Sequence, residues 1–301
     1  MEIRPELAAV MAAVTLLLFV FLYLAYRWAW FRWHCARPHL VTRSPHVHHR
    51  LLLAFRLVSF GYCFGVLLYA TIQKEGENFK FYTTWNYASL VTFFALATAH
   101  SIQMLGREDC PRGPPTLLGR AVWVLFQLNI TMVFVVDVIL WGVLYPMAKK
   151  SDFSKGQSES DILGFVSYNV HGTNCLFMLA ELCLNHMRVV PGHSLFLVSQ
   201  SLIYAFVQWT IKGADPSYVY PYPFLDTSKS TASFWYLGML ALHLLFFLMV
   251  FGLAKLRDCL RGRYGIPVDF DDGTEEEQLL DEAEPAFEKP KAGYTEHDPL
   301  L

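Results

Sequence analysis

The chain has 301 residues, of which 54% are hydrophobic and only 17% are charged, a composition too apolar for an ordinary soluble domain of this length. Its net charge of -2 gives no basic excess, so the sequence predicts no nucleic-acid partner. Six cysteines occur without a C-x-x-C spacing, so neither a disulfide framework nor a zinc site is indicated, and we expect no cofactor and no metal.

Long apolar runs dominate the chain, and each is ended by charge, proline or a polar loop. A helix of about 20 residues crosses the hydrocarbon layer of a membrane, where backbone groups have no other partner than the helix itself. The sequence therefore predicts an all-α membrane protein, a bundle of seven transmembrane helices, at about residues 8–30, 51–72, 83–105, 118–146, 165–187, 193–213 and 232–256.

The distribution of Lys and Arg predicts the orientation of this bundle. Basic residues are concentrated in segments 27–50, 107–120 and 255–263, which all fall on one side of a seven-helix topology. Positively charged loops stay in the cytosol. We therefore expect the N-terminus to be lumenal or extracellular and the C-terminus to be cytosolic.

Three parts of the chain differ in composition. Residues 1–50 hold an anchor helix and a basic, histidine-rich loop, residues 51–260 hold the six-helix core, and residues 265–301 form an acidic tail that we expect to be disordered. The loop sequence RSPHVHHR could suggest a metal site, but its arginines favour contact with anionic lipid headgroups instead.

The acidic tail contains two matches to a dileucine sorting signal, in which an acidic residue precedes a pair of leucines. A cytosolic tail with such signals indicates an endosomal or lysosomal membrane, or the plasma membrane, with clathrin adaptors as partners; the alternative is a tail that only keeps the chain soluble. The residues that form the two matches are Glu275, Leu279 and Leu280 in EEEQLL and Glu296, Leu300 and Leu301 in EHDPLL.

Ionisable residues inside the predicted spans are functional candidates, because burying charge in a membrane is costly. Arg56 lies near a cytosolic helix end, and we expect it to extend to the headgroups. Asp137, His171, Glu181 and His243 are deeper. For each of them, structural hydrogen bonding remains the alternative to chemistry.

The stretch SYNVHGTNCLFMLAEL is the most polar part of any predicted span. Helical spacing places His171 and Asn174 along one stripe, with Glu181 to its side, and that stripe must face protein. The depths that a 1.5 Å rise per residue implies allow His171 and Asp137 to meet Thr83, which lies near the outer end of the third span. Together they would be arranged as in a hydrolase triad, with a hydroxyl nucleophile, a base and an orienting carboxylate.

Residues near Thr83 could assist such a reaction. Asn86 and Tyr87 follow Thr83 at i+3 and i+4 and share its helix face. Tyr87 or Asn174 could supply the donor that an oxyanion needs. The neighbouring Thr84 offers a second hydroxyl, and a threonine at this position can also be simply a back-bonded side chain.

Four motifs in order carry a resemblance to a known family: FKFYTTW, HGTNCLFMLAE, a basic turn followed by proline at Arg188–Pro191, and YPFLD at Tyr222–Asp226. Over about residues 50–256 the chain resembles the androgen-inducible transmembrane hydrolase family, and its rolling stone branch in particular. The resemblance implies a multi-pass threonine hydrolase that cleaves fatty acid esters of hydroxy fatty acids. It places the nucleophile on Thr83 and the catalytic histidine on His171.

The rolling stone branch suggests a second function. Its association with myoblast fusion implies a non-enzymatic membrane protein for cell adhesion, fusion or membrane organisation. The hydrolase hypothesis predicts a membrane lipid or lipid ester as the substrate or partner. A receptor coupled to G proteins is disfavoured, because the third span lacks an Asp-Arg-Tyr-like trio and the seventh lacks an Asn-Pro motif.

Overall fold

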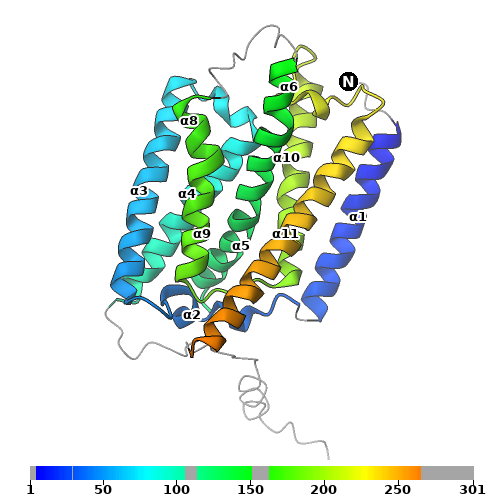
Figure 1. Ribbon diagram of the computed structural model, residues 1–301. Coiled ribbons are helices and arrows are strands. Elements are labelled where there is room, and N and C mark those ends of the chain that lie inside the picture. Colours follow the sequence, from blue (N-terminus) through cyan, green and yellow to red (C-terminus); the bar gives the residue numbers. More distant parts are fainter. Residues whose placement is uncertain (1–4, 29, 106–113, 151–162, 266–301) are drawn as a thin grey trace, which may run out of the picture. The chain divides into compact units, whose positions relative to one another are not determined.

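A computed structural model describes residues 5–28, 30–105, 114–150 and 163–265, and every regular element within these ranges is a helix. The longer helices lie side by side in one bundle (Figure 1). They are α1 (Pro5–Arg27), α3 (His49–Gln73), α4 (Tyr82–Gln103), α5 (Leu117–Val138), α9 (Asn174–Leu184), α10 (Ser194–Ala214) and α11 (Ala232–Arg263).

Short elements connect and extend these helices. The α-helical ones are α2 (Pro38–Thr42), α6 (Tyr145–Lys150) and α8 (Phe165–Tyr168). The 3-10 helices are η1 (Trp33–Ala36), η2 (Glu77–Lys80), η5 (Pro191–His193) and η6 (Pro223–Leu225), and the π-helical segments are η3 (Ile139–Leu144) and η4 (Asn169–Thr173).

Five helical segments are long and apolar enough to cross a membrane: Pro5–Arg27, His49–Gln73, Leu117–Met147, Pro191–Ala214 and Ala232–Arg263. The chain is therefore an integral membrane protein with an all-helical, multi-pass architecture. The other two predicted spans correspond to α4 and to the broken helix α8–η4–α9, which lie in the same bundle (Figure 1).

α4 is the central helix of one half of the bundle, because it packs between α3 and α5. The rings of Phe55 on α3 and Phe94 on α4 lie 6.1 Å apart, and those of Phe93 on α4 and Phe126 on α5 lie 6.2 Å apart. Phe93, Phe94 and Phe126 are completely buried. The middle of α4, which begins one residue before Thr83, is thus packed between two neighbouring helices.

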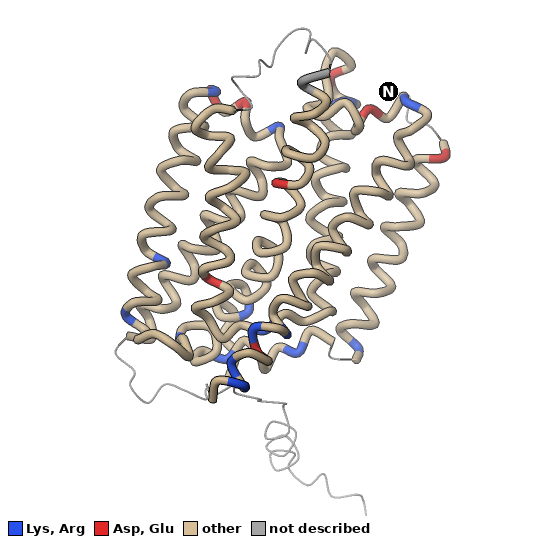
Figure 2. Tube along the Cα trace, in the orientation of Figure 1, with Lys and Arg blue, Asp and Glu red and all other residues tan. Residues whose placement is uncertain are grey.

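The outer surface of the bundle matches a lipid environment. Large apolar side chains of α1 and α11 are exposed, including Phe19 and Leu16 on α1 and Phe234 and Leu248 on α11. Charged residues gather at the two ends of the bundle, with few between them (Figure 2). Apolar sides and charged ends are the arrangement that a bilayer requires.

Two helices are locally irregular near the predicted site. The π-helical segments η3 and η4 continue α5 and precede α9. Within η4, His171 has the non-helical angles φ -129° and ψ 32°. π-bulges of this kind occur frequently at functional sites. The non-helical backbone at His171 is therefore consistent with a functional role for this residue.

Candidate functional site

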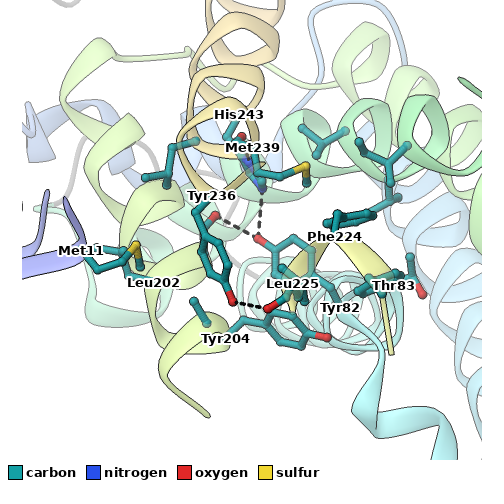
Figure 3. Close-up of a pocket in the computed structure, with 17 residues that line it drawn as sticks. Met11, Tyr82, Thr83, Leu202, Tyr204, Phe224, Leu225, Tyr236, Met239 and His243 are labelled. Carbon is teal, nitrogen blue, oxygen red and sulfur yellow. Dashed lines mark hydrogen bonds between the residues drawn. The ribbon is translucent and has the colours of Figure 1, made fainter. Parts of the chain in front are cut away.

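A pocket with about 670 Å³ of empty space, its mouth included, lies where the first turn of α4 meets α5, α10, η6 and α11. Figure 3 shows side chains from these elements and from α1 converging on it. The lining residues are Met11, Tyr82, Thr83, Val135, Val136, Ile139, Ser201, Leu202, Tyr204, Ala205, Tyr222, Phe224, Leu225, Tyr236, Met239, Leu240 and His243.

The lining of the pocket is mostly apolar. No Asp, Glu, Lys or Arg is among the described residues that line the pocket. Its polar groups are hydroxyls and one imidazole. An apolar pocket with a few convergent polar groups suits a largely apolar ligand.

A chain of hydrogen bonds joins three of these groups. The Tyr82 hydroxyl lies 3.1 Å from His243 Nε2 and 3.0 Å from Ser201 Oγ. His243 Nδ1 lies 2.6 Å from the Met239 carbonyl, so Nδ1 carries the proton and donates it. His243 Nε2 is then an acceptor, and Tyr82 donates to it.

Thr83 lies at the margin of the pocket, away from His243 (Figure 3). It occupies the first turn of α4, whose N-cap residue Phe81 provides no side-chain cap. The first N–H groups of a helix have no partner within the helix. The phenol of Tyr222 approaches the Thr83 side chain and the amides of Thr83 and Tyr82, without completing a hydrogen bond.

His171 belongs to a second polar group, on the α5–η4 side. Its Nδ1 lies 3.8 Å from Asp137 Oδ1, and Asn174 donates to the same oxygen over 3.2 Å. The Trp141 indole donates to the His171 carbonyl over 2.9 Å, which supports the broken turn. His171 Nδ1 itself is buried without a hydrogen bond.

The structure therefore brings the predicted residues together only in part. His171, Asp137 and Asn174 form one group, while Thr83 lines the pocket. No hydrogen bond joins Thr83 to His171, and His171 is not among the lining residues. Val136 lines the pocket, as Thr83 does, and its backbone carbonyl lies against the His171 ring.

The supporting residues have other neighbours. Asn174 is occupied by Asp137, and Tyr87 lies against Cys63 on α3, so neither reaches the pocket as an oxyanion donor. Asn86 is completely buried and both its amide atoms lack a hydrogen bond. It does not line the pocket either.

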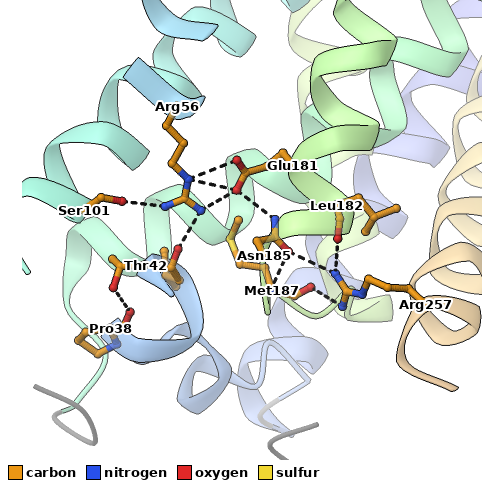
Figure 4. Close-up of polar contacts among 10 residues, drawn as sticks. Pro38, Thr42, Arg56, Ser101, Glu181, Leu182, Asn185, Met187 and Arg257 are labelled. Carbon is orange, nitrogen blue, oxygen red and sulfur yellow. Dashed lines mark hydrogen bonds and ion pairs between the residues drawn. The ribbon is translucent and has the colours of Figure 1, made fainter. Parts of the chain in front are cut away.

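Glu181 has a structural role, and here the expectation for Arg56 was wrong. Both residues are completely buried, and Arg56 Nη2 lies 2.6 Å from Glu181 Oε1 (Figure 4). Arg56 also donates to Ser101 over 2.9 Å and to the Val41 carbonyl over 2.9 Å. The guanidinium does not extend to the headgroups because a carboxylate on another helix neutralises it.

Asn185 extends this pair toward α11. It donates to Glu181 over 3.1 Å and accepts from Arg257 over 3.2 Å. Arg257 also donates to the carbonyls of Leu182 and Met187, each over 3.0 Å. We refer to Arg56, Ser101, Glu181, Asn185 and Arg257 as the ionic network; it joins α3, α4, α9, α11 and the segment that follows α9.

Among the described residues, no group of three or more His, Cys, Asp or Glu side chains is placed to hold a metal ion. In the histidine-rich loop, His46 Nε2 accepts a hydrogen bond from Arg261 of α11 over 3.0 Å. The sorting residues Glu275, Leu279, Leu280, Glu296, Leu300 and Leu301 lie outside the described residues.

An integral membrane bundle with an apolar pocket at its interior defines the class of protein. The sequence also matches the family model described as FAR-17a/AIG1-like protein over residues 50–257. Since this is well over half of the chain, the protein belongs to the FAR-17a/AIG1-like family, the androgen-inducible family that the motifs indicated. No curated protein and no solved structure matches the chain.

Several pocket residues were not found from sequence. Ser201 stands in an ordinary helical stretch, and Tyr82 belongs to the motif FKFYTTW, which was noted only as a family signature. Tyr222 belongs to the motif YPFLD, which was noted only as a family signature. The partnership of Arg56 and Glu181 did have a signal, since each was a single charge of opposite sign inside a predicted span.

Proposed function

We propose that the protein is an intramembrane hydrolase of lipid esters, with Thr83 as nucleophile and His171 as general base. The observation that carries this proposal is the position of Thr83 beside a mostly apolar pocket, with no Asp, Glu, Lys or Arg among the described residues that line it. Membership of the FAR-17a/AIG1-like family supports it. Fatty acid esters of hydroxy fatty acids are the substrates that the family resemblance favours.

The proposed topology has seven spans, with α4 and α8–η4–α9 counted among them, a lumenal or extracellular N-terminus and a cytosolic C-terminus. Thr83 then lies in the outer half of the membrane, because it is in the first turn of a helix that runs toward the cytosol. The concentration of basic residues at one end of the bundle supports this orientation (Figure 2).

The proposed base requires a local movement. Val136 lines the pocket together with Thr83 and contacts the His171 ring through its backbone carbonyl, but no hydrogen bond joins Thr83 to His171. The non-helical backbone at His171 provides a segment that can change conformation when substrate enters. Asp137 would then orient the imidazole, as carboxylates do in hydrolase triads.

The test uses the purified full-length protein and an ester of a long-chain fatty acid with a hydroxy fatty acid. Thr83→Ala and His171→Ala are each expected to abolish turnover in protein that still folds. Thr92→Ala is the matched control, because Thr92 is an exposed α4 threonine that bonds only to the Ala88 carbonyl, over 2.9 Å. Retained turnover in either site variant would remove that residue from the mechanism.

A non-enzymatic organiser of membranes or cell contacts is the second candidate. The absence of a hydrogen bond between Thr83 and His171 is the observation that favours it. It predicts that no ester is hydrolysed and that Thr83→Ala supports the same cell-contact phenotype as the unaltered chain.

For the acidic tail we propose sorting to endosomes or lysosomes through clathrin adaptors. Replacement of Leu279, Leu280, Leu300 and Leu301 by alanine is then expected to shift the protein to the plasma membrane. Unchanged distribution between internal membranes and the cell surface would contradict the sorting role.

A further inference from the structure

The pocket contains one phenol whose hydrogen-bonding capacity is unused. Tyr204 donates to the Lys80 carbonyl over 2.7 Å, and Tyr236 donates to the Leu225 carbonyl over 3.0 Å. Tyr82 is bound to His243. The Tyr222 hydroxyl is buried and completes no hydrogen bond, although only 6% of the residue is exposed. Such a donor is costly unless a ligand supplies its partner.

Aromatic packing holds the Tyr222 ring in place. It stacks on Phe224 with the ring centroids 5.3 Å apart and an interplanar angle of 12°. It also meets Phe81 edge-on, at 5.9 Å and 74°. Because Phe81 is the residue directly before α4, this packing fixes the phenol against the first turn of that helix.

The position of the hydroxyl matters because of what lies beside it. It approaches the Thr83 side chain and the backbone amides of Thr83 and Tyr82. Burial raises the pKa of Tyr222 to about 12, so the phenol stays protonated at neutral pH and remains a donor. A protonated donor next to a nucleophile is placed where negative charge develops during attack on an ester.

We propose that Tyr222 is a further catalytic residue, whose hydroxyl donates a hydrogen bond to the carbonyl oxygen of a lipid ester held in the pocket and stabilises the oxyanion. This inference rests on the proposed hydrolase function and adds the residue that binds the carbonyl oxygen of the ester. It takes the role that the sequence assigned to Tyr87 or Asn174.

The proposed reaction proceeds through an acyl-threonine. Thr83 Oγ1 forms a bond to the carbonyl carbon, its proton passes to the base, and the carbonyl oxygen becomes an oxyanion that Tyr222 binds. When the ester C–O bond breaks, the leaving alkoxide takes the proton, and the product alcohol departs. Water then attacks the carbonyl carbon of the acyl-threonine and gives its proton to the base. When the bond to Thr83 Oγ1 breaks, the base returns this proton to Oγ1, which releases the acid and restores Thr83.

The lining also limits the substrate class. No Lys or Arg is among the described residues of the pocket wall, so a carboxylate inside it would lack a partner, at a high desolvation cost. The part of the substrate within the pocket is therefore an uncharged ester with its acyl chain against the apolar residues of α1, α10 and α11. Any charged end of the molecule lies outside.

The test compares Tyr222→Phe with Tyr220→Phe in the full-length protein. Tyr220 lies in the same segment, does not line the pocket and is bonded to Thr227 over 3.3 Å. For Tyr222→Phe, kcat on a long-chain ester is expected to fall about 10²–10³-fold, as when one oxyanion donor is removed. KM should change little, and melting temperature should not fall, because no completed hydrogen bond is lost.

Tyr220→Phe is expected to keep its turnover per folded molecule. Wild-type kcat in Tyr222→Phe, with turnover abolished in Thr83→Ala, overturns the role of Tyr222 and leaves the hydrolase intact. Turnover retained in Thr83→Ala overturns the proposed nucleophile instead. A fall in kcat for Tyr222→Phe that matches a loss of folded protein also overturns the catalytic role, since it shows that the hydroxyl acts only on folding.

Discussion

The ionic network and the pocket both contain buried polar atoms within one apolar bundle, and they differ in whether those atoms have hydrogen-bond partners. In the network, Arg56, Glu181 and Asn185 are completely buried, and none of them has a polar atom without a partner (Figure 4). In the pocket, the Tyr222 hydroxyl completes no hydrogen bond. Buried charges require partners from the protein, whereas a buried neutral hydroxyl without a partner costs less and can bind a ligand. The contrast separates the region that holds the helices together from the region that can act on a substrate.

Removing one charge from the network should have the largest effect on stability. Arg56→Met leaves Glu181 buried without its cation, and the free energy of unfolding should fall by about 3–5 kcal/mol. Chemical denaturation of the detergent-solubilised protein measures this. Adding Glu181→Met should recover most of the loss, and Arg50→Met, at an exposed site on the same helix, should have little effect. A single variant as stable as the unaltered chain would contradict the structural role.

Filling the pocket should affect activity and spare stability. Leu202→Trp places an indole in the pocket. The rate of hydrolysis of long-chain esters should then fall by about tenfold or more, while the rate for short-chain esters should change little. Met249→Trp, on the exposed side of α11, is the matched control. Equal loss on esters of all chain lengths would show that the acyl chain does not occupy this pocket.

Two phenols of the pocket should respond differently to the same substitution. Tyr82→Phe removes the donor to His243 Nε2 and leaves a buried acceptor unpaired, so we expect a loss of about 1–3 kcal/mol. Tyr222→Phe removes no completed bond and should change stability by no more than about 0.5 kcal/mol. Thermal unfolding of both variants measures the difference. Similar losses would mean that the two hydroxyls are equally engaged.

A small pH effect is expected where the histidine-rich loop meets α11. The pKa of His46 lies below the usual histidine value of 6.5, mainly because the side chain is partly buried and then because of the charges of Arg261 and Arg257. Since the folded-state pKa is lowered, this contact contributes stability above pH 6.5 and loses it as the pH falls below that value. Asp258, which pairs with Arg257 over 2.8 Å, moderates the repulsion.

The site is exposed, so solvent screens the effect, and we expect a fall in melting temperature on the order of 1 °C between about pH 7.5 and 5.5. His46→Gln should remove this component, because glutamine does not titrate. An unchanged pH profile in that variant would assign the dependence to another group.

Sequence reasoning found the helical architecture, because apolar runs in a membrane have no alternative to helix. It also singled out Thr83, which lines the pocket, and His171 and Asp137, which lie close together, while their catalytic roles stay predictions. It could not find Tyr222 or the link between Tyr82 and His243, since these contacts join residues 140 and 161 positions apart in the chain. Arg56 was misread because its depth was judged from its own helix, while its partner is on another.

Covalent labelling of the nucleophile is the most direct test of the central claim. The full-length protein is treated with a long-chain alkyl fluorophosphonate, which forms a stable adduct with an activated hydroxyl, and the modified residue is mapped by peptide mass spectrometry. The account predicts an adduct on Thr83 that is lost in Thr83→Ala and forms more slowly in Tyr222→Phe. An adduct on Ser201 instead, or ester hydrolysis that continues in Thr83→Ala, would contradict it.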